Sequence, residues 1–488
     1  MTCEPLLQWP ENDSAKESWS LDRTQASSFG DSQISQLDKS RLLLNVHFEQ
    51  HQNPLSCSIL GLSCSRMEIH EPLQKCDIIG LKLDSVEMKS DIWHSDSQGG
   101  NTNKMSAFPV FCTLLLFVAV QCAPISSSFG RIEWTFDAGS SIESSPGLLT
   151  VNGSSSIFFG DYNSFFYGVN ALTGKRLWKP YLSGEMVRSS PAIYSNSSDA
   201  IFFAVGGDSK FYALDCYTGL VKWIYDCGAP SQEYASSSPA VYDNGFKSLV
   251  YFGSLDGYIY AISILSGQLE WKFATQGPIY ASPRVHLKGA SVLVVIGSDD
   301  GNVYALDGKN GSLLWQFQTQ DKVRGSFTFH DTTNDTIVYS GSNDAYFYAL
   351  SGSTGDKIFS VATGGPVYST ATTFVHPNGT CTAYVGSYDK LVYAVDCLTG
   401  DKAWTFETYD YVIASPTLLS VGSALTLYVG DNTGYFFALD AITGTKDWDA
   451  TAESPVWSSA VIVQSPTAGP LVVVGTQGGT VFAFKSSK

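Results

Sequence analysis

The sequence predicts an all-β, eight-bladed β-propeller, and three observations lead to that fold class. One string of residues recurs at a nearly fixed interval, the interval matches one four-stranded blade, and a lone strand near the front supplies what the last copy lacks. The fullest copy runs from Tyr212 to Trp223 and reads Tyr-Ala-Leu-Asp-x-x-Thr-Gly-x-x-x-Trp.

Eight copies of this string begin with an aromatic residue, and successive starts are 44 to 48 residues apart. The starts are Tyr167, Tyr212, Tyr260, Tyr304, Tyr348, Tyr393, Phe437 and Phe482. Seven copies reach the final aromatic position, at Trp178, Trp223, Trp271, Trp315, Phe359, Trp404 and Trp448. Because a propeller blade of four strands takes roughly 40–45 residues, each copy is expected to be one blade.

The eighth copy has no glycine and no tryptophan after Phe482. A lone strand around Trp134, within residues 131–136, precedes the first copy. We therefore expect the Trp134 strand to complete the last blade, since such closure pairs the two edges that an open ring would expose. The predicted propeller domain spans residues 124–488.

Each blade reads as four strands. The first begins near a Ser-Ser-Pro element such as Ser189–Pro191, the second ends at a glycine such as Gly253, and a polar turn such as Ser254–Gly257 follows. The repeated string forms the third strand, and the tryptophan lies on the fourth. In the string, the aspartate accepts turn N–H groups, the glycine takes a positive φ, and the tryptophan packs beside the alanine. Residues that recur in every blade are assigned to the scaffold.

The string resembles the tryptophan-docking motif of the pyrroloquinoline-quinone-like propeller family, over about residues 131–488. That resemblance implies a fold more than a function. Its members include quinone-dependent dehydrogenases, bacterial outer-membrane assembly lipoproteins and lumenal domains of stress-sensor kinases. The dehydrogenases carry adjacent cysteines over the quinone and carboxylates around calcium, whereas this chain has no Cys-Cys pair.

The resemblance therefore favours a non-catalytic, secreted or lumenal propeller that acts as a ligand- or protein-binding scaffold, with no catalytic residues and no cofactor. The alternative is a dehydrogenase-like quinoprotein acting on alcohols or sugars through a degenerate site, and only that alternative requires pyrroloquinoline quinone (PQQ) and calcium. A third reading, a lumenal sensor of unfolded segments, would need a membrane tether. None was found after the predicted signal peptide.

Residues 1–104 share nothing with the repeat and are interpreted as an unstructured segment or translated upstream sequence. Residues 105–123 are typical of a secretory signal peptide, so Met105 is the predicted start. The apolar run 108–120 is shorter than the roughly 20 residues that span a bilayer, so no stable membrane span is expected. The alternative is a genuine disordered extension with an internal anchor. The expected location is extracellular, lysosomal or in the lumen of the endoplasmic reticulum.

The chain carries a formal net charge of −17, and residues 1–104 hold 9 basic and 15 acidic side chains. An acidic chain without a basic stripe argues against nucleic-acid binding. Acidity supports solubility and does not identify a partner. We expect a monomer whose partner is an unknown protein or a small anionic ligand.

Four cysteines follow the predicted signal peptide: Cys216, Cys227, Cys381 and Cys397. An even number fits an oxidising compartment. Cys381 and Cys397 are equally far from a turn near Asp389, so we predict a disulfide between them. The remaining predicted pair is Cys216 with Cys227, and the alternative is four free thiols.

Five N-glycosylation sequons also follow the signal peptide, at Asn152, Asn196, Asn310, Asn334 and Asn378. Four fall between the first and second strands of a blade, and Asn310 falls between the third and fourth. In a propeller those loops share one face, so the opposite face carries no sequon. His286, His330 and His376 lie on the sequon-bearing face as well, and no metal site is expected there.

One position varies from blade to blade on the sequon-free face, just before the innermost strand. Its residues are Glu143, Arg188, Ser236, Tyr280, Arg324, Tyr368, Ile413 and Trp457. A position that varies inside a regular repeat is free of the demands of the fold, and arginine and aromatic residues commonly anchor ligands. We predict a ligand-binding channel mouth formed by Glu143, Arg188, Tyr280, Arg324, Tyr368 and Trp457. The alternative is a solvated rim in which Glu143 pairs with an arginine.

Overall fold

The computed structural model describes residues 43–50, 53–60 and 86–87 by their backbone, and residues 130–228, 236–245, 247–465 and 469–486 with their side chains. The chain divides into two compact units, residues 1–120 and 121–488. In the first unit, β1 (Leu43–Gln50), β2 (Asn53–Leu60) and β3 (Val86–Glu87) form an antiparallel sheet in the order β2-β1-β3. The predicted signal peptide lies outside the described residues, and the interpretation of residues 1–104 stays a prediction.

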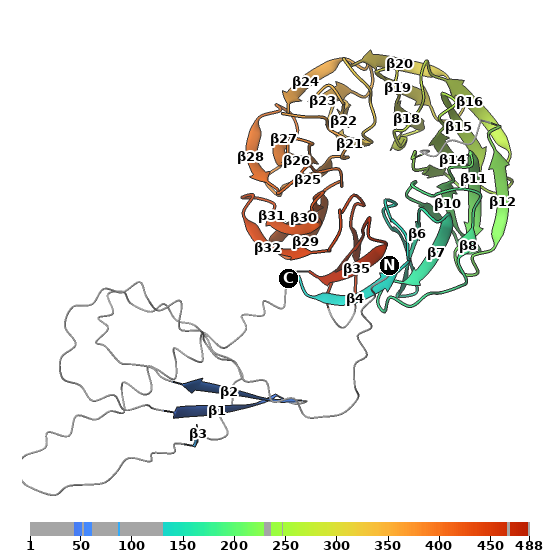
Figure 1. Cartoon of the computed structure of the whole chain (residues 1–488). Coiled ribbons are helices and arrows are strands. Elements are labelled where there is room, and N and C mark those ends of the chain that lie inside the picture. The colour runs from blue at the N-terminus through green and yellow to red at the C-terminus, as the bar shows by residue number, and fades with distance from the viewer. Residues whose placement is uncertain are drawn as a thin grey trace, which may run out of the picture. The chain divides into compact units, whose positions relative to one another are not determined.

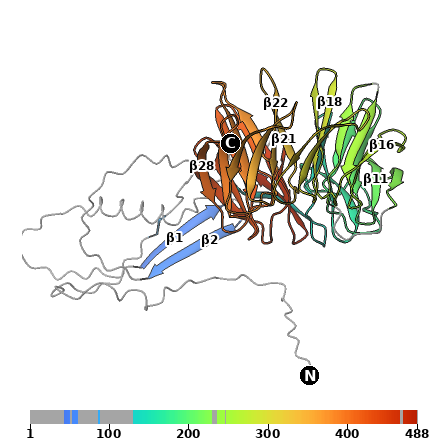
Figure 2. The same ribbon diagram turned by 90° about the horizontal axis from the view of Figure 1, so that it is seen from above.

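The second unit is an eight-bladed β-propeller, as predicted (Figure 1). Each blade is one four-stranded antiparallel sheet, and Figure 2 shows the ring of blades from its side. The innermost strands are β5 (Gly147–Val151), β9 (Ala192–Ser195), β13 (Ala240–Asp243), β17 (Arg284–Lys288), β21 (Phe327–Asp331), β25 (Thr372–Val375), β29 (Thr417–Val421) and β33 (Val461–Val463). The second strands are β6 (Ser154–Gly160), β10 (Ala200–Val205), β14 (Ser248–Gly253), β18 (Ser291–Gly297), β22 (Thr336–Gly341), β26 (Cys381–Gly386), β30 (Ala424–Gly430) and β34 (Leu471–Gly475).

The third strands carry the repeated string and are almost wholly buried. They are β7 (Phe165–Asn170), β11 (Lys210–Asp215), β15 (Tyr258–Ser263), β19 (Asn302–Asp307), β23 (Tyr346–Ser351), β27 (Leu391–Asp396), β31 (Tyr435–Asp440) and β35 (Thr480–Lys485). The outermost strands are β8 (Tyr181–Leu182), β12 (Val221–Asp226), β16 (Leu269–Ala274), β20 (Leu313–Gln318), β24 (Lys357–Ala362), β28 (Lys402–Glu407), β32 (Lys446–Thr451) and β4 (Ile132–Asp137).

The last blade closes as predicted, because β4 pairs antiparallel with β35 and places Trp134 opposite Ala483. The N-terminal strand of the ring thus lies beside its C-terminal strand in Figure 1. The fourth strand of the first blade departs from the expectation. There β8 has two residues, and Trp178 precedes it instead of lying within it.

Neighbouring blades are joined by tryptophan side chains that lie flat on the repeat glycines. The ring of Trp271 faces Gly311 of the next blade so closely that a Cβ added there would lie 2.6 Å from it. Gly311 also has φ +76°, a conformation that glycine adopts without strain. The same arrangement joins Trp134 to Gly174, Trp178 to Gly219, Trp223 to Gly267, Trp315 to Gly355, Phe359 to Gly400, Trp404 to Gly444 and Trp448 to Gly130.

Six of the docked indoles also donate a hydrogen bond across the blade boundary, whereas the buried N–H of Trp448 has no partner among the described residues. The N–H of Trp315 donates to the carbonyl oxygen of Gly352 at 2.8 Å, and the N–H of Trp223 donates to that of Ile264 at 2.9 Å. Four other indoles make the equivalent bond: Trp134 to the carbonyl of Ala171, Trp178 to that of Cys216, Trp271 to that of Gly308 and Trp404 to that of Ala441. A net hydrogen bond contributes about 1 kcal/mol, so the buried ring area contributes more to each junction.

Phe359 replaces tryptophan in the fifth blade and has no N–H to donate. The carbonyl oxygen of Cys397, which the missing indole would reach, accepts from the Tyr339 hydroxyl at 2.7 Å. The carbonyls of Gly308 and Ala441 likewise accept from Tyr251 and Tyr384 in blades that keep their tryptophan. The next blade boundary therefore keeps a buried hydrogen bond although the repeat has changed. The tyrosine bond is thus a second link between neighbouring blades, and it remains here although the indole N–H is lost.

The tyrosine that opens the string has a role that the sequence analysis did not assign. Its hydroxyl donates to the aspartate of the preceding polar turn, as in Tyr304 to Asp300 at 2.7 Å and Tyr348 to Asp344 at 2.8 Å. Burial raises the pKa of both phenols, so they remain neutral donors. The bond fixes the turn between the second and third strands on the sequon-free face.

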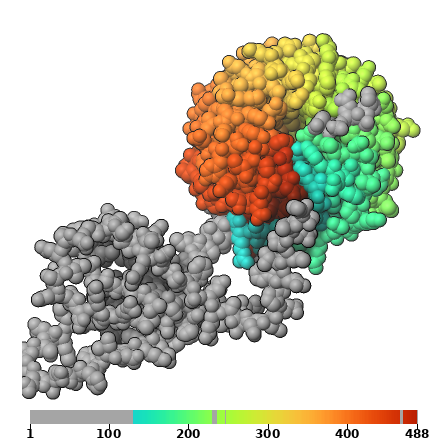
Figure 3. Space-filling view, in the orientation of Figure 1, coloured from blue at the N-terminus to red at the C-terminus, as the bar shows by residue number. Residues whose placement is uncertain are grey.

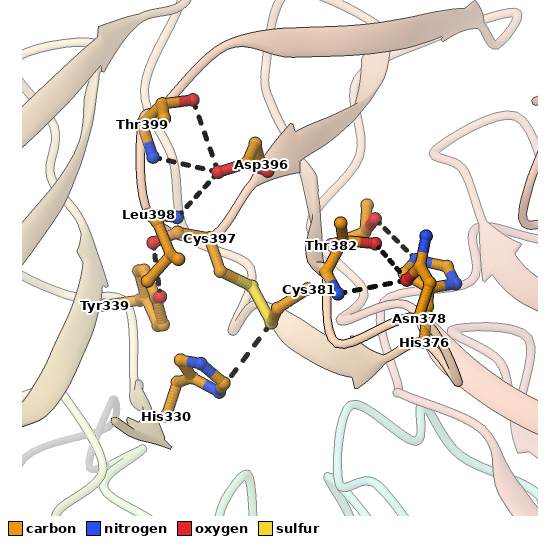
Figure 4. Close-up of a disulfide and its surroundings, with 11 residues drawn as sticks. His330, Tyr339, His376, Asn378, Cys381, Thr382, Asp396, Cys397, Leu398 and Thr399 are labelled. Atoms are coloured by element: carbon orange, nitrogen blue, oxygen red, sulfur yellow. Dashed lines mark hydrogen bonds between the residues drawn. A yellow bond between two sulfur atoms is a disulfide. The ribbon is translucent and has the colours of Figure 1, made fainter. Parts of the chain in front are cut away.

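The predicted disulfide between Cys381 and Cys397 is present and joins the start of β26 to the end of β27 (Figure 4). His330 of the preceding blade points at it, with Nδ1 3.7 Å from the Cys381 sulfur. The covalent link thus lies inside one blade hairpin, on the face that carries the sequons.

The second predicted disulfide, between Cys216 and Cys227, is wrong, because both residues are free cysteines. They lie at opposite ends of one hairpin. Cys216 follows the last residue of β11, whereas the N–H of Cys227 donates to the carbonyl of Ser209, just before β11 begins. Six strand residues span about 20 Å, and disulfide-bonded cysteines need Cα atoms within about 7 Å of each other.

No helix long and apolar enough to cross a bilayer occurs within the ranges that the structure describes.

We expect Gly311→Ala to lower the free energy of unfolding by about 2–4 kcal/mol, because the new Cβ meets both the Trp271 ring and an unfavourable φ. Gly289→Ala is the matched control, since Gly289 also has a positive φ but nothing within 4 Å of an added Cβ. It should cost only about 1 kcal/mol. Denaturant unfolding measures both, and equal losses would contradict the docking role.

Replacing both Cys381 and Cys397 by alanine should lower the free energy of unfolding by about 3 kcal/mol, because the bond closes a loop with a sequence separation of 16. Cys227→Ala, which breaks no disulfide, is the control. Without reductant, alkylation followed by peptide mapping should label Cys216 and Cys227 after unfolding. A cross-linked Cys216–Cys227 peptide would contradict the assignment.

Candidate functional site

The eight residues of the variable position converge on the central channel of the propeller. All eight line one cavity of about 830 Å³, and Figure 3 shows the hollow that the ring of blades surrounds. We refer to Glu143, Arg188, Ser236, Tyr280, Arg324, Tyr368, Ile413 and Trp457 as the mouth residues. The structure therefore brings the predicted site residues together, while ligand binding by them stays a prediction.

The buried residue before a mouth residue determines the direction in which the mouth side chain points. These residues are the fully or almost fully buried Ile142, Val187, Ile279, Val323, Val367, Val412 and Val456. Each packs on the glycine that ends the second strand of the preceding blade, as Val323 packs on Gly297, where an added Cβ would lie 2.4 Å away. Since that side chain points into the blade boundary, the next residue along the extended chain points to the opposite side, into the channel.

A ring of hydroxyl groups lies two residues further along each innermost segment. The backbone N–H of Ser190 donates to the Ser238 hydroxyl at 2.9 Å, and the N–H of Ser238 donates to that of Ser282 at 2.9 Å. The same bond joins Ser145 to Ser190, Thr370 to Ser415, Ser415 to Ser459 and Ser459 to Ser145. The Ser459–Ser145 bond crosses the closure between the last and first blades.

Glu143 is paired with Arg188, as one of the sequence alternatives anticipated. The Arg188 Nε donates to Glu143 Oε2 at 2.7 Å. Glu143 Oε1 accepts from the Tyr162 hydroxyl and from the Gln477 amide at 3.2 Å. The carboxylate thus ties the first, second and last blades together at the mouth, and its oxygens are engaged.

Arg324 is paired as well, with Asp299 of the preceding blade. Its Nε and one terminal nitrogen donate to the two Asp299 oxygens at 2.8 and 2.6 Å, and these bonds raise the pKa of the guanidinium. The guanidinium also lies 4.2 Å from the centre of the Tyr280 ring, within range of a cation–π contact. The sequence analysis placed Arg324 at the mouth and missed Asp299, which belongs to an ordinary turn.

Aromatic residues form the other side of the mouth. The Tyr388 ring lies 4.9 Å from that of Tyr368 and stacks on that of Tyr411 at 4.4 Å. Burial raises the pKa of Tyr388 to about 12, so its hydroxyl is neutral at physiological pH. Trp457 is held by its indole N–H, which donates to Asn432 at 2.9 Å. Tyr388 also lines the cavity and was missed, because it occurs in a turn of the repeat.

Arg284 is the most informative lining residue that the sequence analysis did not select. It begins β17, lines the cavity and is exposed to the water in it. It forms no hydrogen bond or ion pair within the part of the chain that the structure describes. Although its side chain is exposed within the channel, the surrounding protein partly desolvates Arg284 and thereby lowers the pKa of its guanidinium.

The sequence did contain a signal for Arg284. Counted from the mouth residue, the equivalent positions in the other blades are small or β-branched: Gly147, Ala192, Ala240, Thr328, Thr372, Thr417 and Val461. Arg284 alone is charged in this series. This second departure from the repeat lies four residues after the mouth position, outside the predicted site.

The described residues do not fit a calcium ion in the channel. Calcium takes six to eight oxygen ligands, several of them carboxylates, whereas the cavity is lined by one carboxylate, Glu143, whose oxygens are engaged. The Cys381–Cys397 disulfide is not among the lining residues. Within the described ranges, no group of three or more His, Cys, Asp or Glu residues is placed to hold a metal ion.

All five predicted glycosylation sites are exposed and lie in the loops that were expected. Asn152, Asn196, Asn334 and Asn378 fall between the first and second strands of their blades, and Asn310 falls between β19 and β20. His286 lies on this face too, where it pairs with Asp331 at 3.0 Å. Glycosylation itself stays a prediction.

Comparison with known families gives a match over nearly the whole propeller. The family model described as outer membrane protein assembly factor BamB, of the PQQ-repeat type, matches residues 119–297 and 299–488. None of the curated proteins compared with the chain is a significant match.

Several solved structures share the fold. BamB from Moraxella catarrhalis is 18% identical, with a TM-score of 0.55 over 73% of this chain and 99% of that one. A europium-containing methanol dehydrogenase is 15% identical, with a TM-score of 0.59 over 73% and 93%. The quinohemoprotein alcohol dehydrogenase from Comamonas testosteroni is 15% identical, with a TM-score of 0.55 over 72% and 76%. At these identities the likeness concerns the fold alone.

Arg324→Ala should lower the free energy of unfolding by about 1–3 kcal/mol, because it leaves Asp299, whose side chain is 9% exposed, without its bidentate partner. The control is Lys322→Ala, whose more exposed ammonium lies 3.6 Å from the same carboxylate and should contribute less than about 0.5 kcal/mol. Thermal or denaturant unfolding tests this, and similar effects for both variants would contradict the pairing.

Proposed function

We propose that this chain, which belongs to the family described as outer membrane protein assembly factor BamB, is a non-catalytic binding scaffold. Its ligand is a protein segment or a small anionic molecule that enters the channel mouth. The proposal assigns recognition to the mouth residues and leaves the repeated string as scaffold.

One observation carries the proposal: a position that varies from blade to blade inside the regular repeat lines the cavity in all eight blades. Arg188, Tyr280, Arg324, Tyr368 and Trp457 gather there from five different blades. Arginine, tyrosine and tryptophan are the side chains that most often dominate binding energy at interfaces. A pocket of this size suits a small molecule or a few residues of a peptide.

The chemistry of the lining supports binding in preference to catalysis. General acid–base catalysis needs a titratable group free to reach the substrate. The described lining contains one carboxylate, Glu143, already held by Arg188, Tyr162 and Gln477, and includes no histidine, lysine or cysteine. A quinone-dependent dehydrogenase would also require a calcium site that these residues do not offer.

The distribution of surface features supports a secreted or lumenal location. Five exposed sequons and a disulfide suit the secretory pathway. Glycans at Asn152, Asn196, Asn310, Asn334 and Asn378 would cover one face and leave the channel mouth open on the other. A monomeric propeller could then present its mouth to a partner.

The test uses the glycosylated protein secreted by a eukaryotic host. Molecules that copurify with it are identified by mass spectrometry, and the purified ligand is then titrated against variants. The double variant Arg188→Ala/Arg324→Ala should bind at least about tenfold more weakly, because it removes two sets of charge-assisted donors. The control Lys175→Ala/Arg176→Ala, which removes two exposed cations from a turn of the first blade, should bind normally. Unchanged affinity in the mouth variant would refute the site.

A second measurement separates binding from catalysis. The purified protein is incubated with PQQ and calcium, and dye reduction by alcohols or sugars is recorded. We expect no quinone-dependent turnover. Turnover that is lost on removal of calcium would overturn the scaffold assignment.

A further inference from the structure

The central channel carries more positive than negative charge, although the chain as a whole is strongly acidic. Its formal net charge is −17. The described residues that line the cavity nevertheless include three arginines and a single carboxylate: Arg188, Arg284, Arg324 and Glu143. Such a lining concentrates anions in a confined, partly desolvated space.

The three arginines are not equivalent. Arg188 is neutralised by Glu143 at 2.5 Å, and Arg324 is neutralised by Asp299 at 2.6 Å. Arg284 has no carboxylate partner within the described residues, although its side chain lies in the same cavity. Arg284 is therefore the cation whose donors are available to a ligand.

The position of Arg284 is not explained by the needs of the fold. The innermost strand has small or β-branched residues at this point in the other seven blades. In two of them the side chain joins neighbouring blades, since the hydroxyl of Thr328 donates to the Ala371 carbonyl and that of Thr417 to the Ala460 carbonyl. Arg284 makes no such bond, so it adds no comparable link between blades.

The hydroxyl ring supplies further donors beside Arg284. Ser282 lies two residues before Arg284 on an extended segment, so both side chains are on the same side, facing the channel. The hydroxyl oxygens of Ser190, Ser238 and Ser282 are positioned in the same ring, and those of Ser238 and Ser282 accept a backbone N–H from the preceding blade. Each hydroxyl hydrogen then remains free to donate into the channel.

We propose that Arg284 and the adjacent ring hydroxyls form an oxyanion site inside the channel, below the mouth, that takes the carboxylate or phosphate group of a small molecule. A guanidinium presents paired N–H donors that match two oxygens of either group. Serine hydroxyls can bond to the remaining oxygens. The aromatic side of the mouth then contacts the rest of the ligand.

This inference rests on the proposed function in that both concern one cavity, but it assigns the anchoring charge to a different residue. The mouth arginines contribute recognition while paired with their carboxylates. Arg284 contributes the uncompensated charge. The two assignments therefore predict different sensitivities to substitution.

The test measures binding of three probes at constant ionic strength, namely inorganic phosphate, citrate and acetate, by calorimetry and by intrinsic tryptophan fluorescence. The native protein should bind phosphate or citrate saturably. Arg284→Ala should weaken that binding at least about tenfold, and Arg284→Lys should retain part of it because the charge remains. Arg176→Ala, which removes an exposed arginine of a first-blade turn that does not line the cavity, should change it less than about twofold.

Preference among the probes identifies the natural group. Tighter binding of citrate than of phosphate indicates a carboxylate ligand, and the reverse indicates a phosphate ligand. Absence of saturable binding, or equal binding by the native protein and Arg284→Ala, would overturn the oxyanion site.

The outcomes also separate this site from the proposed function. If Arg284→Ala binds phosphate and citrate normally while the mouth variant loses the copurified ligand, the scaffold assignment stands and the oxyanion site fails. If Arg284→Ala loses the oxyanion while the mouth variant keeps the copurified ligand, the mouth assignment fails and the oxyanion site stands. Circular dichroism and unfolding of each variant confirm that the fold is intact.

Discussion

The propeller depends on one contact made at every blade boundary, in which an aromatic ring lies flat on a glycine of the next blade. The contact is possible only because the glycine has no Cβ, and at six boundaries a carbonyl of the next blade also accepts the indole N–H. The need for a glycine without a Cβ explains why the glycine and the tryptophan of the string recur together. Where tryptophan is lost, at Phe359, the Tyr339 hydroxyl keeps the carbonyl bonded. The ring contact is therefore more conserved within this chain than the donor that accompanies it.

The aromatic rings dock near the outer strands of the blades, so other groups hold the backbone in place around the central channel. Buried valine and isoleucine side chains pack on glycines at the ends of the second strands, and serine hydroxyls link neighbouring innermost segments. Both devices fix the backbone without using the mouth residue of each blade, so the identity of that residue can vary. A rigid ring with a variable position at its mouth can hold recognition groups in place with little loss of side-chain entropy on binding. Binding specificity can therefore differ between propellers of the same fold.

Charge pairing divides the lining of the channel into two zones. At the mouth, Glu143 and Asp299 engage Arg188 and Arg324, so these arginines act as oriented hydrogen-bond donors more than as free charges. Inside, Arg284 has no such partner within the described residues. An uncompensated cation in a partly desolvated channel attracts anions more strongly than one at the surface, because the surrounding protein screens charge less than water does. The proposed oxyanion site rests on that difference in pairing.

The sequence by itself determined the fold, the number of blades, the closure by the Trp134 strand and the Cys381–Cys397 disulfide, because each depends on spacing along a regular repeat. It also located the mouth residues, since variation inside a repeat is visible without coordinates. Only the tertiary structure showed that Cys216 and Cys227 lie at opposite ends of a hairpin, and that Asp299 neutralises Arg324 from another blade. It alone distinguished Arg284 from the paired arginines. Ion pairs between blades depend on side-chain positions that sequence spacing does not encode. The sequence therefore could not show which arginine of the channel has no carboxylate partner.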